Sequence, residues 1–264
     1  MKTRIISGVL MLLAWLALLY LNNFSLFWLA SCLLAILGGY EFFTMRGERG
    51  ASRLSAIIIT GLPVFILVKG GSHDLLLAAL AAGLVLHASW TVFSAGPGRP
   101  PFDQFNNRLL GLAYIGFTIP HILLLVTLEH GVIWLLILST ITIASDSGAY
   151  FCGKAWGSHK LSPHISPGKT VEGFVGGVVS GTAVTTIFGY FFLPQTNLAA
   201  LAVVAALLCC LGVIGDLSES IIKRASGVKD SSHLIPGHGG ILDRVDSLLF
   251  CAPSLYYILH LQLL

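Results

Sequence analysis

Residues 198–224 read LAALAVVAALLCCLGVIGDLSESIIKR, and this stretch decides the fold class. No charged residue occurs between positions 198 and 215, and a helix needs about 20 mostly apolar residues to cross a hydrocarbon core of about 30 Å. Asp216 follows directly, although an ionised carboxylate at mid-membrane costs about 2.5–3.5 kcal/mol on insertion scales. The stretch therefore predicts a membrane helix that ends in an acid with a function.

The rest of the chain has the same apolar character. Hydrophobic residues make up 55% and charged residues 10% of its 264 positions, whereas soluble domains carry roughly 25% charged residues. This composition excludes a soluble globular protein and predicts an all-α integral membrane protein with about nine transmembrane helices in a single polytopic domain over residues 1–264. The predicted spans cover roughly residues 5–21, 25–43 (with Glu41 inside), 54–69, 75–94, 109–128, 131–151, 171–193, 198–216 and 247–264.

The basic residues predict how the chain crosses the membrane. With nine spans, the N-terminus and every second loop hold all Lys and Arg residues except Lys69. Loops rich in Lys and Arg stay in the cytoplasm, so the N-terminus is expected there and the C-terminus outside. Lys2 and Arg4 precede an apolar run as in a secretory signal, but no small-residue cleavage site follows, and we expect an uncleaved helix.

Cysteine usage indicates packing. All five cysteines lie in or at the ends of apolar spans and none forms a CxxC pair. Buried free cysteines behave as small hydrophobes, so neither a zinc site nor a disulfide framework is expected.

Asp216 belongs to a polar stripe. If its helix continues, Glu219, Ser220 and Lys223 lie on the same face, at spacings of three, four and seven residues. Arg224 adjoins that face. The simpler interpretation is an ion-pair stripe that ends a span, but the position of Asp216 beside a long apolar run favours a function.

The segment 220–246, SIIKRASGVKDSSHLIPGHGGILDRVD, combines two kinds of charge. Its cations suit phosphates and its carboxylates suit a divalent metal. Asp243 and Asp246 project to one side of a helical turn and could share Mg²⁺ with Asp216. The glycines around His238 let backbone N–H groups approach an anion, and His238 itself is favoured as a turn residue over a metal ligand. The segment predicts a metal-assisted reaction at a phosphate. Its cations are Lys223, Arg224, Lys229 and Arg244, its acids Asp230, Asp243 and Asp246.

Two sites lie upstream of this segment. Asp146 either assists the site or pairs with a donor on a neighbouring helix, and both interpretations stay open. The loop SPGKTVEG (166–173) almost fits a phosphate-binding P-loop, but Pro163 replaces the first glycine and no strand is expected before it. We therefore expect Lys169 to contact a phosphate at the start of the following helix. Gly173, Gly177 and Gly181 recur at the spacing typical of tight helix packing.

The chain resembles a known family. Residues 220–246 match SxIKRxxxxKDxSxxIPxHGGIxDRVD at every fixed position, a pattern that resembles the signature of the phosphatidate cytidylyltransferases, or CDP-diacylglycerol synthases. DSGAYxxGK (146–154) and SPxKTxxG (166–173) resemble the family's upstream motifs in the same order. For residues 1–130 the resemblance rests on a similar helix-rich layout.

The resemblance implies a reaction in phospholipid biosynthesis. CTP and phosphatidic acid would give CDP-diacylglycerol and pyrophosphate, with Mg²⁺ required, in a bacterial-type inner membrane with the site facing the cytoplasm. The expected partners are CTP, phosphatidic acid and the bilayer, with no nucleic acid; a second, monovalent ion such as K⁺ and a homodimer through the glycine-spaced helix are further expectations.

Residue roles follow from combining both lines of reasoning. The expected metal ligands are Asp216, Asp243 and Asp246. The expected catalytic cations are Lys223, Arg224 and Arg244. The expected substrate-binding residues are Asp146, Lys169, Ser220, Lys229, His238, Gly239 and Gly240. Two alternatives remain: a CTP-dependent enzyme acting on another lipid, and a transporter of an anionic solute, which the absence of an inverted repeat disfavours.

Overall fold

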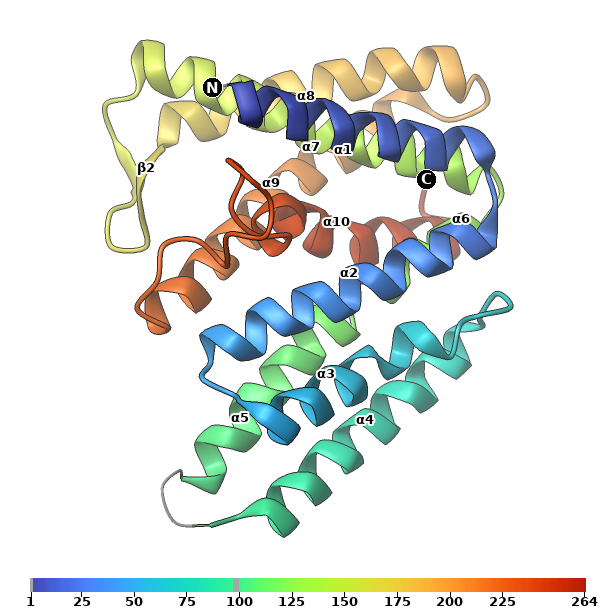
Figure 1. The fold of residues 1–264 in the computed structure, drawn as a ribbon. Helices are drawn as coiled ribbons and strands as arrows, with labels where there is room; N and C mark the ends of the chain where they lie inside the picture. The colour runs from blue at the N-terminus through green and yellow to red at the C-terminus, as the bar shows by residue number, and fades with distance from the viewer. Residues whose placement is uncertain (1, 97–99) are drawn as a thin grey trace. The chain divides into compact units, whose positions relative to one another are not determined.

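The computed structural model describes residues 2–96 and 100–264. Helices dominate (Figure 1). In chain order the elements are α1 (Lys2–Leu21), α2 (Phe24–Met45), α3 (Gly50–Phe65), α4 (His73–Ser94), α5 (Pro101–Gly111), the π-helical turn η1 (Leu112–Gly116), α6 (Pro120–Thr127), α7 (Gly131–Trp156), β1 (Lys160–Ser162), β2 (Ser166–Thr170), α8 (Val171–Phe192), α9 (Leu198–Ala225) and α10 (Leu242–His260).

The predicted spans all fall on helices. In the described part of the chain, seven helical segments are long and apolar enough to cross a membrane. One of them, Pro101–Thr127, runs through α5, η1 and α6. The helix α3 is apolar but only 16 residues long, and α10 is not among the seven. The protein is therefore a predominantly helical integral membrane protein, and the count of nine spans stays a prediction.

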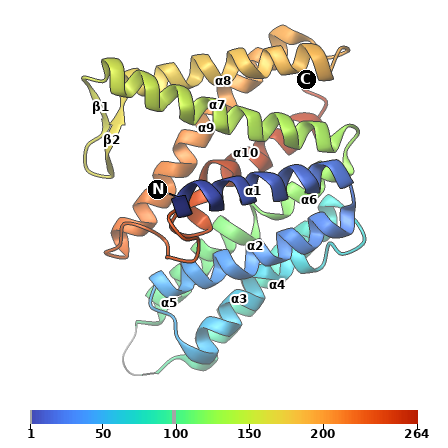
Figure 2. The same ribbon diagram turned by 45° about the horizontal axis from the view of Figure 1, so that its top comes forward.

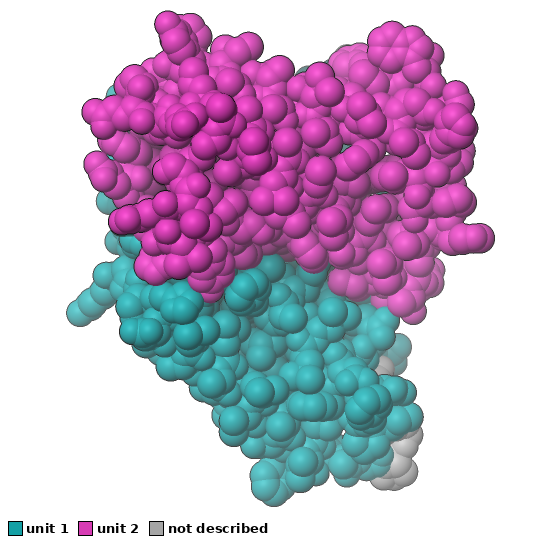
Figure 3. All heavy atoms as spheres, turned by 180° about the vertical axis from the view of Figure 1, so that it is seen from behind, with its two compact units in different colours: residues 1–127, 230–244 teal, residues 128–229, 245–264 magenta. Residues whose placement is uncertain are grey.

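The chain divides into two compact units, coloured separately in Figure 3. Unit 1 comprises residues 1–127 and 230–244, and unit 2 comprises residues 128–229 and 245–264. The single domain over residues 1–264 that the sequence indicates stays a prediction.

Unit 1 contains a buried ion pair among apolar helices. Arg108 on α5 is fully buried and lies 3.6 Å from Glu48, which follows α2. The Arg108 guanidinium also donates to the carbonyl of Ser52 at 2.8 Å. A buried charge is tolerated only when it is paired and hydrogen-bonded, so this contact fixes the end of α5 against α2 and α3.

Unit 2 is built on the packing of α7 against α8, which run side by side in both ribbon views (Figures 1 and 2). A Cβ atom at Gly177 would lie 2.8 Å from the Ser145 carbonyl oxygen, and one at Gly173 would lie 2.8 Å from that of Ala149. Only glycine permits so close an approach. The predicted packing role of these glycines is confirmed, with α7 of the same chain as the partner.

A small hairpin was not expected from the sequence. Strands β1 and β2 pair antiparallel, with Lys160 opposite Thr170 and Ser162 opposite Ser166. The carboxylate of Glu172, in the first turn of α8, ties the start of the hairpin by accepting from the backbone N–H of Ser158 at 3.0 Å. The loop after α7 is thus ordered, and it carries Lys169.

Candidate functional site

The signature segment contributes to both units. Residues 220–229 and 245–246 belong to unit 2, and residues 230–244 to unit 1. The two parts are described separately below.

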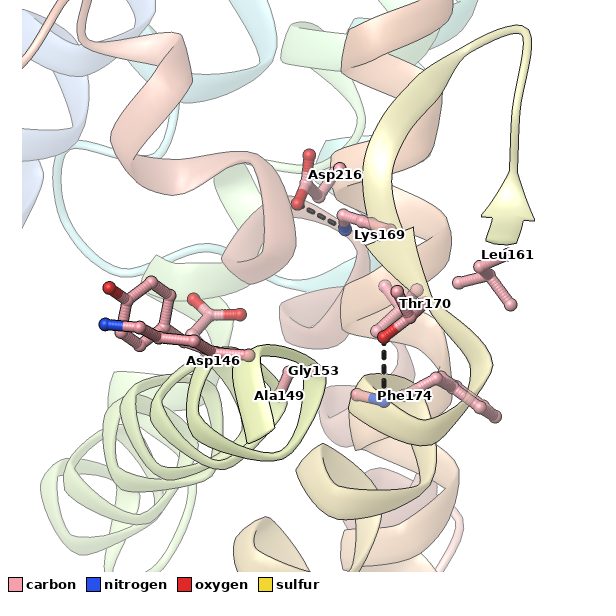
Figure 4. Close-up of a pocket in the computed structure, with 13 residues that line it drawn as sticks. Asp146, Ala149, Gly153, Leu161, Lys169, Thr170, Phe174 and Asp216 are labelled. Atoms are coloured by element: carbon pink, nitrogen blue, oxygen red, sulfur yellow. Dashed lines mark hydrogen bonds and ion pairs between the residues drawn. The ribbon is translucent and has the colours of Figure 1, made fainter. Parts of the chain in front are cut away.

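A cavity of about 400 Å³ opens in unit 2 (Figure 4). Two carboxylates line it, Asp146 from α7 and Asp216 from α9, together with the cations Lys154 and Lys169. Tyr150 and Phe174 add aromatic surface. Asp146 and Lys169, the site residues expected from the two upstream motifs, therefore line one cavity together with Asp216 of α9. Lys154 was not expected there as a site residue, although it ends the first of those motifs.

Lys169 reaches the acid of α9 directly. Its ammonium group forms an ion pair with the Asp216 carboxylate (Figure 4). Lys169 was expected at the start of the following helix but lies in strand β2. Helix α8 begins after it, because Thr170 is the N-cap and accepts a hydrogen bond from the Gly173 N–H at 3.1 Å. Both side chains of the pair keep about a quarter of their surface exposed (25% and 29%), so the pair can meet a ligand in the cavity.

A third carboxylate interacts with this group. Asp246 lies on α10, outside the seven candidate spans. Burial raises its pKa to about 7, with repulsion from Asp216 and then Asp146 as further causes, against a hydrogen bond from the Ser247 N–H. Carboxylates that repel one another in this way favour binding of a proton or a cation. Among the described residues, however, no group of three or more His, Cys, Asp or Glu side chains is arranged to hold a metal ion.

The polar stripe of α9 is a single continuous helix face. Helix α9 runs unbroken from Leu198 to Ala225, as expected. Within it, the Lys223 ammonium lies 2.7 Å from the Glu219 carboxylate, and both side chains are almost fully buried. Lys223 is thus engaged in a buried ion pair, while Arg224 is exposed and donates to the Val228 carbonyl at 3.1 Å. Ser220 is buried and Lys229 is exposed.

In unit 1 the glycine-rich turn folds around Asp243. One oxygen of that carboxylate, Oδ2, accepts hydrogen bonds from the N–H of Gly240 at 2.8 Å and from the N–H and hydroxyl of Ser231 at 3.0 and 2.9 Å. Gly239 has a positive φ of 83°, which suits glycine. The N–H of Gly240, expected to meet a substrate anion, is used to position Asp243.

Two residues near the N-terminus contact this turn and were not expected from the sequence. The Ser7 hydroxyl lies 2.8 Å from His238 Nδ1 and 3.1 Å from the Pro236 carbonyl oxygen. Arg4, one helical turn earlier, lines a second cavity of about 450 Å³ together with Arg244. His233, His238 and Asp230 also line that cavity. His238 is hydrogen-bonded in a turn, as favoured, and the basic N-terminus was interpreted only as a topology signal.

The candidate spans place the chain in the class of integral membrane proteins, and the carboxylates and cations that line one cavity among its apolar helices suit a phosphate and its counterion. The sequence pattern of the cytidylyltransferase family matches residues 2–262. The chain therefore belongs to the cytidylyltransferase family and is a nucleotidyltransferase enzyme of the membrane.

Curated relatives match over almost their whole length. A phosphatidate cytidylyltransferase of Staphylococcus saprophyticus is 36% identical over 262 residues, covering 98% of this chain and 99% of the relative. Proteins of the same name from Haemophilus influenzae and Bacillus subtilis are each 34% identical, covering 97% and 99% of this chain and 98% of either relative.

Proposed function

We propose that the chain transfers CMP from CTP to phosphatidic acid and so forms CDP-diacylglycerol and pyrophosphate for phospholipid biosynthesis. The relatives that match its full length carry the name of this activity. The observation that carries the proposal is the cavity of unit 2, which Lys154 and Lys169 line together with Asp146 on α7 and Asp216 on α9, two candidate membrane helices. Cations and carboxylates together suit a phosphate and its counterion.

The reaction needs no nucleophile from the protein. An oxygen of the lipid phosphate attacks the α-phosphorus of CTP, a new P–O–P bond forms, and the bond to the β-phosphate breaks to release pyrophosphate. Two polyanions repel each other, so the protein must position them and stabilise the charge that develops on the leaving group. Lys169 and Lys154 are the proposed contacts for the nucleotide phosphates, with the exposed Arg224 and Lys229 as further cations.

Mg²⁺ fits the donors of this site. Asp146, Asp216 and Asp246 offer carboxylate oxygens, and their mutual repulsion is relieved by a cation. Mg²⁺ usually takes only one or two protein carboxylates and completes its shell with water and phosphate oxygens, so three converging side chains are not required. We propose Asp216 and Asp246 as ligands. A metal-binding role for Asp243 stays a prediction from the sequence. When bound, the ion would neutralise phosphate charge. A monovalent ion beside it stays a prediction.

The proposed setting is the inner membrane of a bacterium, with the site facing the cytoplasm where CTP is found. The distribution of Lys and Arg supports this orientation. A homodimer is not supported by the glycine-spaced helix, because Gly173 and Gly177 contact α7 and Gly181 lies nearest Cys209 on α9, all within the same chain.

The test is a substrate panel on the purified protein in detergent–lipid micelles. With Mg²⁺ and CTP, phosphatidic acid should yield pyrophosphate and a cytidine-containing lipid, and EDTA should abolish both. Product from a polyprenyl phosphate or an ether-linked phosphatidic acid, but not from phosphatidic acid, would favour the other lipid-acting enzyme. No pyrophosphate with any lipid, together with anion flux in liposomes, would favour transport.

A further inference from the structure

Glu41 is a charged residue buried within a membrane helix. It lies one turn before the end of α2, one of the seven candidate spans, and is 1% exposed. Each of its carboxylate oxygens accepts one serine hydroxyl and one backbone N–H. Oε1 accepts from Ser232 Oγ at 2.6 Å and from the Ile241 N–H at 2.8 Å. Oε2 accepts from the Leu242 N–H at 3.0 Å and lies 3.0 Å from Ser231 Oγ, whose single proton it shares with Asp243 Oδ2. All four donors come from the signature segment.

This arrangement requires a carboxylate. An amide at the same place would have one oxygen and one NH₂ group. In either orientation of that amide, the NH₂ group would face a backbone N–H, from Ile241 or from Leu242. A donor facing a donor in a buried site leaves both groups unsatisfied, which costs more than a missing hydrogen bond. Gln is therefore a poor replacement for Glu41 despite its equal size.

The hydrogen bonds lead directly to Asp243. The Ser231 hydroxyl lies between the two carboxylates, 3.0 Å from Glu41 Oε2 and 2.9 Å from Asp243 Oδ2. Gly240, whose N–H holds Asp243, packs so closely that an added Cβ would lie 2.6 Å from Glu41 Oε2. Glu41 thus fixes both ends of the turn that presents Asp243.

We infer that Glu41 is a positioning residue for the reaction. It contacts no substrate, and it holds the turn 231–242 so that Asp243 and the first residues of α10 keep the arrangement that the reaction needs. The effect on activity rests on the proposed function, whereas the effect on the turn can be measured without it.

The experiment compares Glu41→Gln and Glu41→Asp with the wild type and with Glu129→Gln, a control whose side chain is 91% exposed. Hydrogen–deuterium exchange of the full-length protein in micelles reports on peptides that cover residues 230–244. Steady-state kinetics report on kcat and on the KM values for CTP and phosphatidic acid.

In Glu41→Gln we expect exchange in the segment 230–244 to rise about tenfold or more, and kcat to fall by about tenfold or more, while both KM values stay within about threefold. Glu41→Asp keeps both acceptor oxygens and should recover part of kcat, which a role in general packing would not produce. Glu129→Gln should behave as the wild type.

Unchanged exchange in the segment 230–244, or an unchanged kcat, in Glu41→Gln would overturn the inference. If that variant does not fold, the double variant Ser231→Ala and Ser232→Ala removes two of the four donors to Glu41 without adding an amide. Unchanged exchange in the segment 230–244 of this double variant would equally overturn the inference. A wild-type protein without transferase activity would contradict the proposed function alone, because the exchange data would still test the position of the turn.

Discussion

Lys169 and Asp216 form an ion pair that joins strand β2 to helix α9 at the cavity of unit 2. The pair places a cation from the hairpin beside the acid that ends the longest uncharged run of the chain. Both members line that cavity. Substitution of Lys169 therefore tests its proposed role as a contact for the nucleotide phosphates.

Lys169→Ala should lower kcat/KM for CTP by about 10- to 150-fold, because a hydrogen bond to a charged group contributes about 1.5–3 kcal/mol. Initial rates of lipid product formation at varied CTP concentration give this value. Lys69→Ala, at an exposed turn after α3, is the matched control. A value within twofold of the wild type would remove Lys169 from the nucleotide site.

The buried pair of Glu219 and Lys223 predicts an asymmetric effect on stability. Lys223→Met should lower the free energy of unfolding by about 3 kcal/mol, because it leaves the Glu219 carboxylate buried without its cation. The double variant Glu219→Gln with Lys223→Met should recover most of the loss. Thermal unfolding in detergent measures both. If the double variant regains stability but not activity, Lys223 also binds phosphate, as the sequence predicts; equal stability of the single variant and the wild type would contradict the pair.

Packing of α7 on α8 predicts that Gly177 tolerates no side chain. A Cβ atom there would lie 2.8 Å from the Ser145 carbonyl oxygen, and overpacking costs about 1–3 kcal/mol. Gly177→Ala should lower the unfolding temperature measurably. Gly168→Ala, where no atom lies within 4 Å of the added Cβ, should not. Equal unfolding temperatures for the two variants would show that the helices do not meet through these glycines.

The cavity of unit 1 predicts a role for Arg4. Arg4 begins the candidate span Arg4–Leu21 and lines this cavity with Arg244, and we expect it to contact the phosphate of the lipid substrate. Arg4→Gln should raise KM for phosphatidic acid by about tenfold and leave KM for CTP unchanged, since one charge-assisted contact is lost. Arg49→Gln, at an exposed arginine before α3, is the control. Equal effects on both KM values would argue against a lipid site.

Much of this architecture could be predicted from the sequence. Apolar runs mark the helices because the membrane demands intrasegment hydrogen bonding, and the glycine spacing of α8 predicted its tight contact. The motif residues Asp146 and Lys169 were expected to contribute to the site, and both line the cavity with Asp216.

The remaining features depend on contacts between residues far apart in the sequence. Glu41 lies 190 or more positions from the serine hydroxyls that donate to it. A carboxylate within an apolar run indicates an unfavourable burial of charge, but the sequence does not indicate which groups hydrogen-bond to it. Arg4 and Ser7 have no local pattern that links them to the turn at His238. The hairpin was missed because its strands are only three and five residues long, too short for a periodic signal.

The most direct test of the central claim follows the phosphorus atoms of CTP. Purified protein is incubated with Mg²⁺, phosphatidic acid and CTP labelled at either the α- or the γ-phosphorus. The lipids are then extracted into organic solvent, and the label they carry is counted. The account predicts that α-label enters the lipid in a one-to-one ratio with released pyrophosphate and that γ-label stays in the aqueous phase. Transfer of γ-label to the lipid, or no transfer of α-label under any of these conditions, would contradict it.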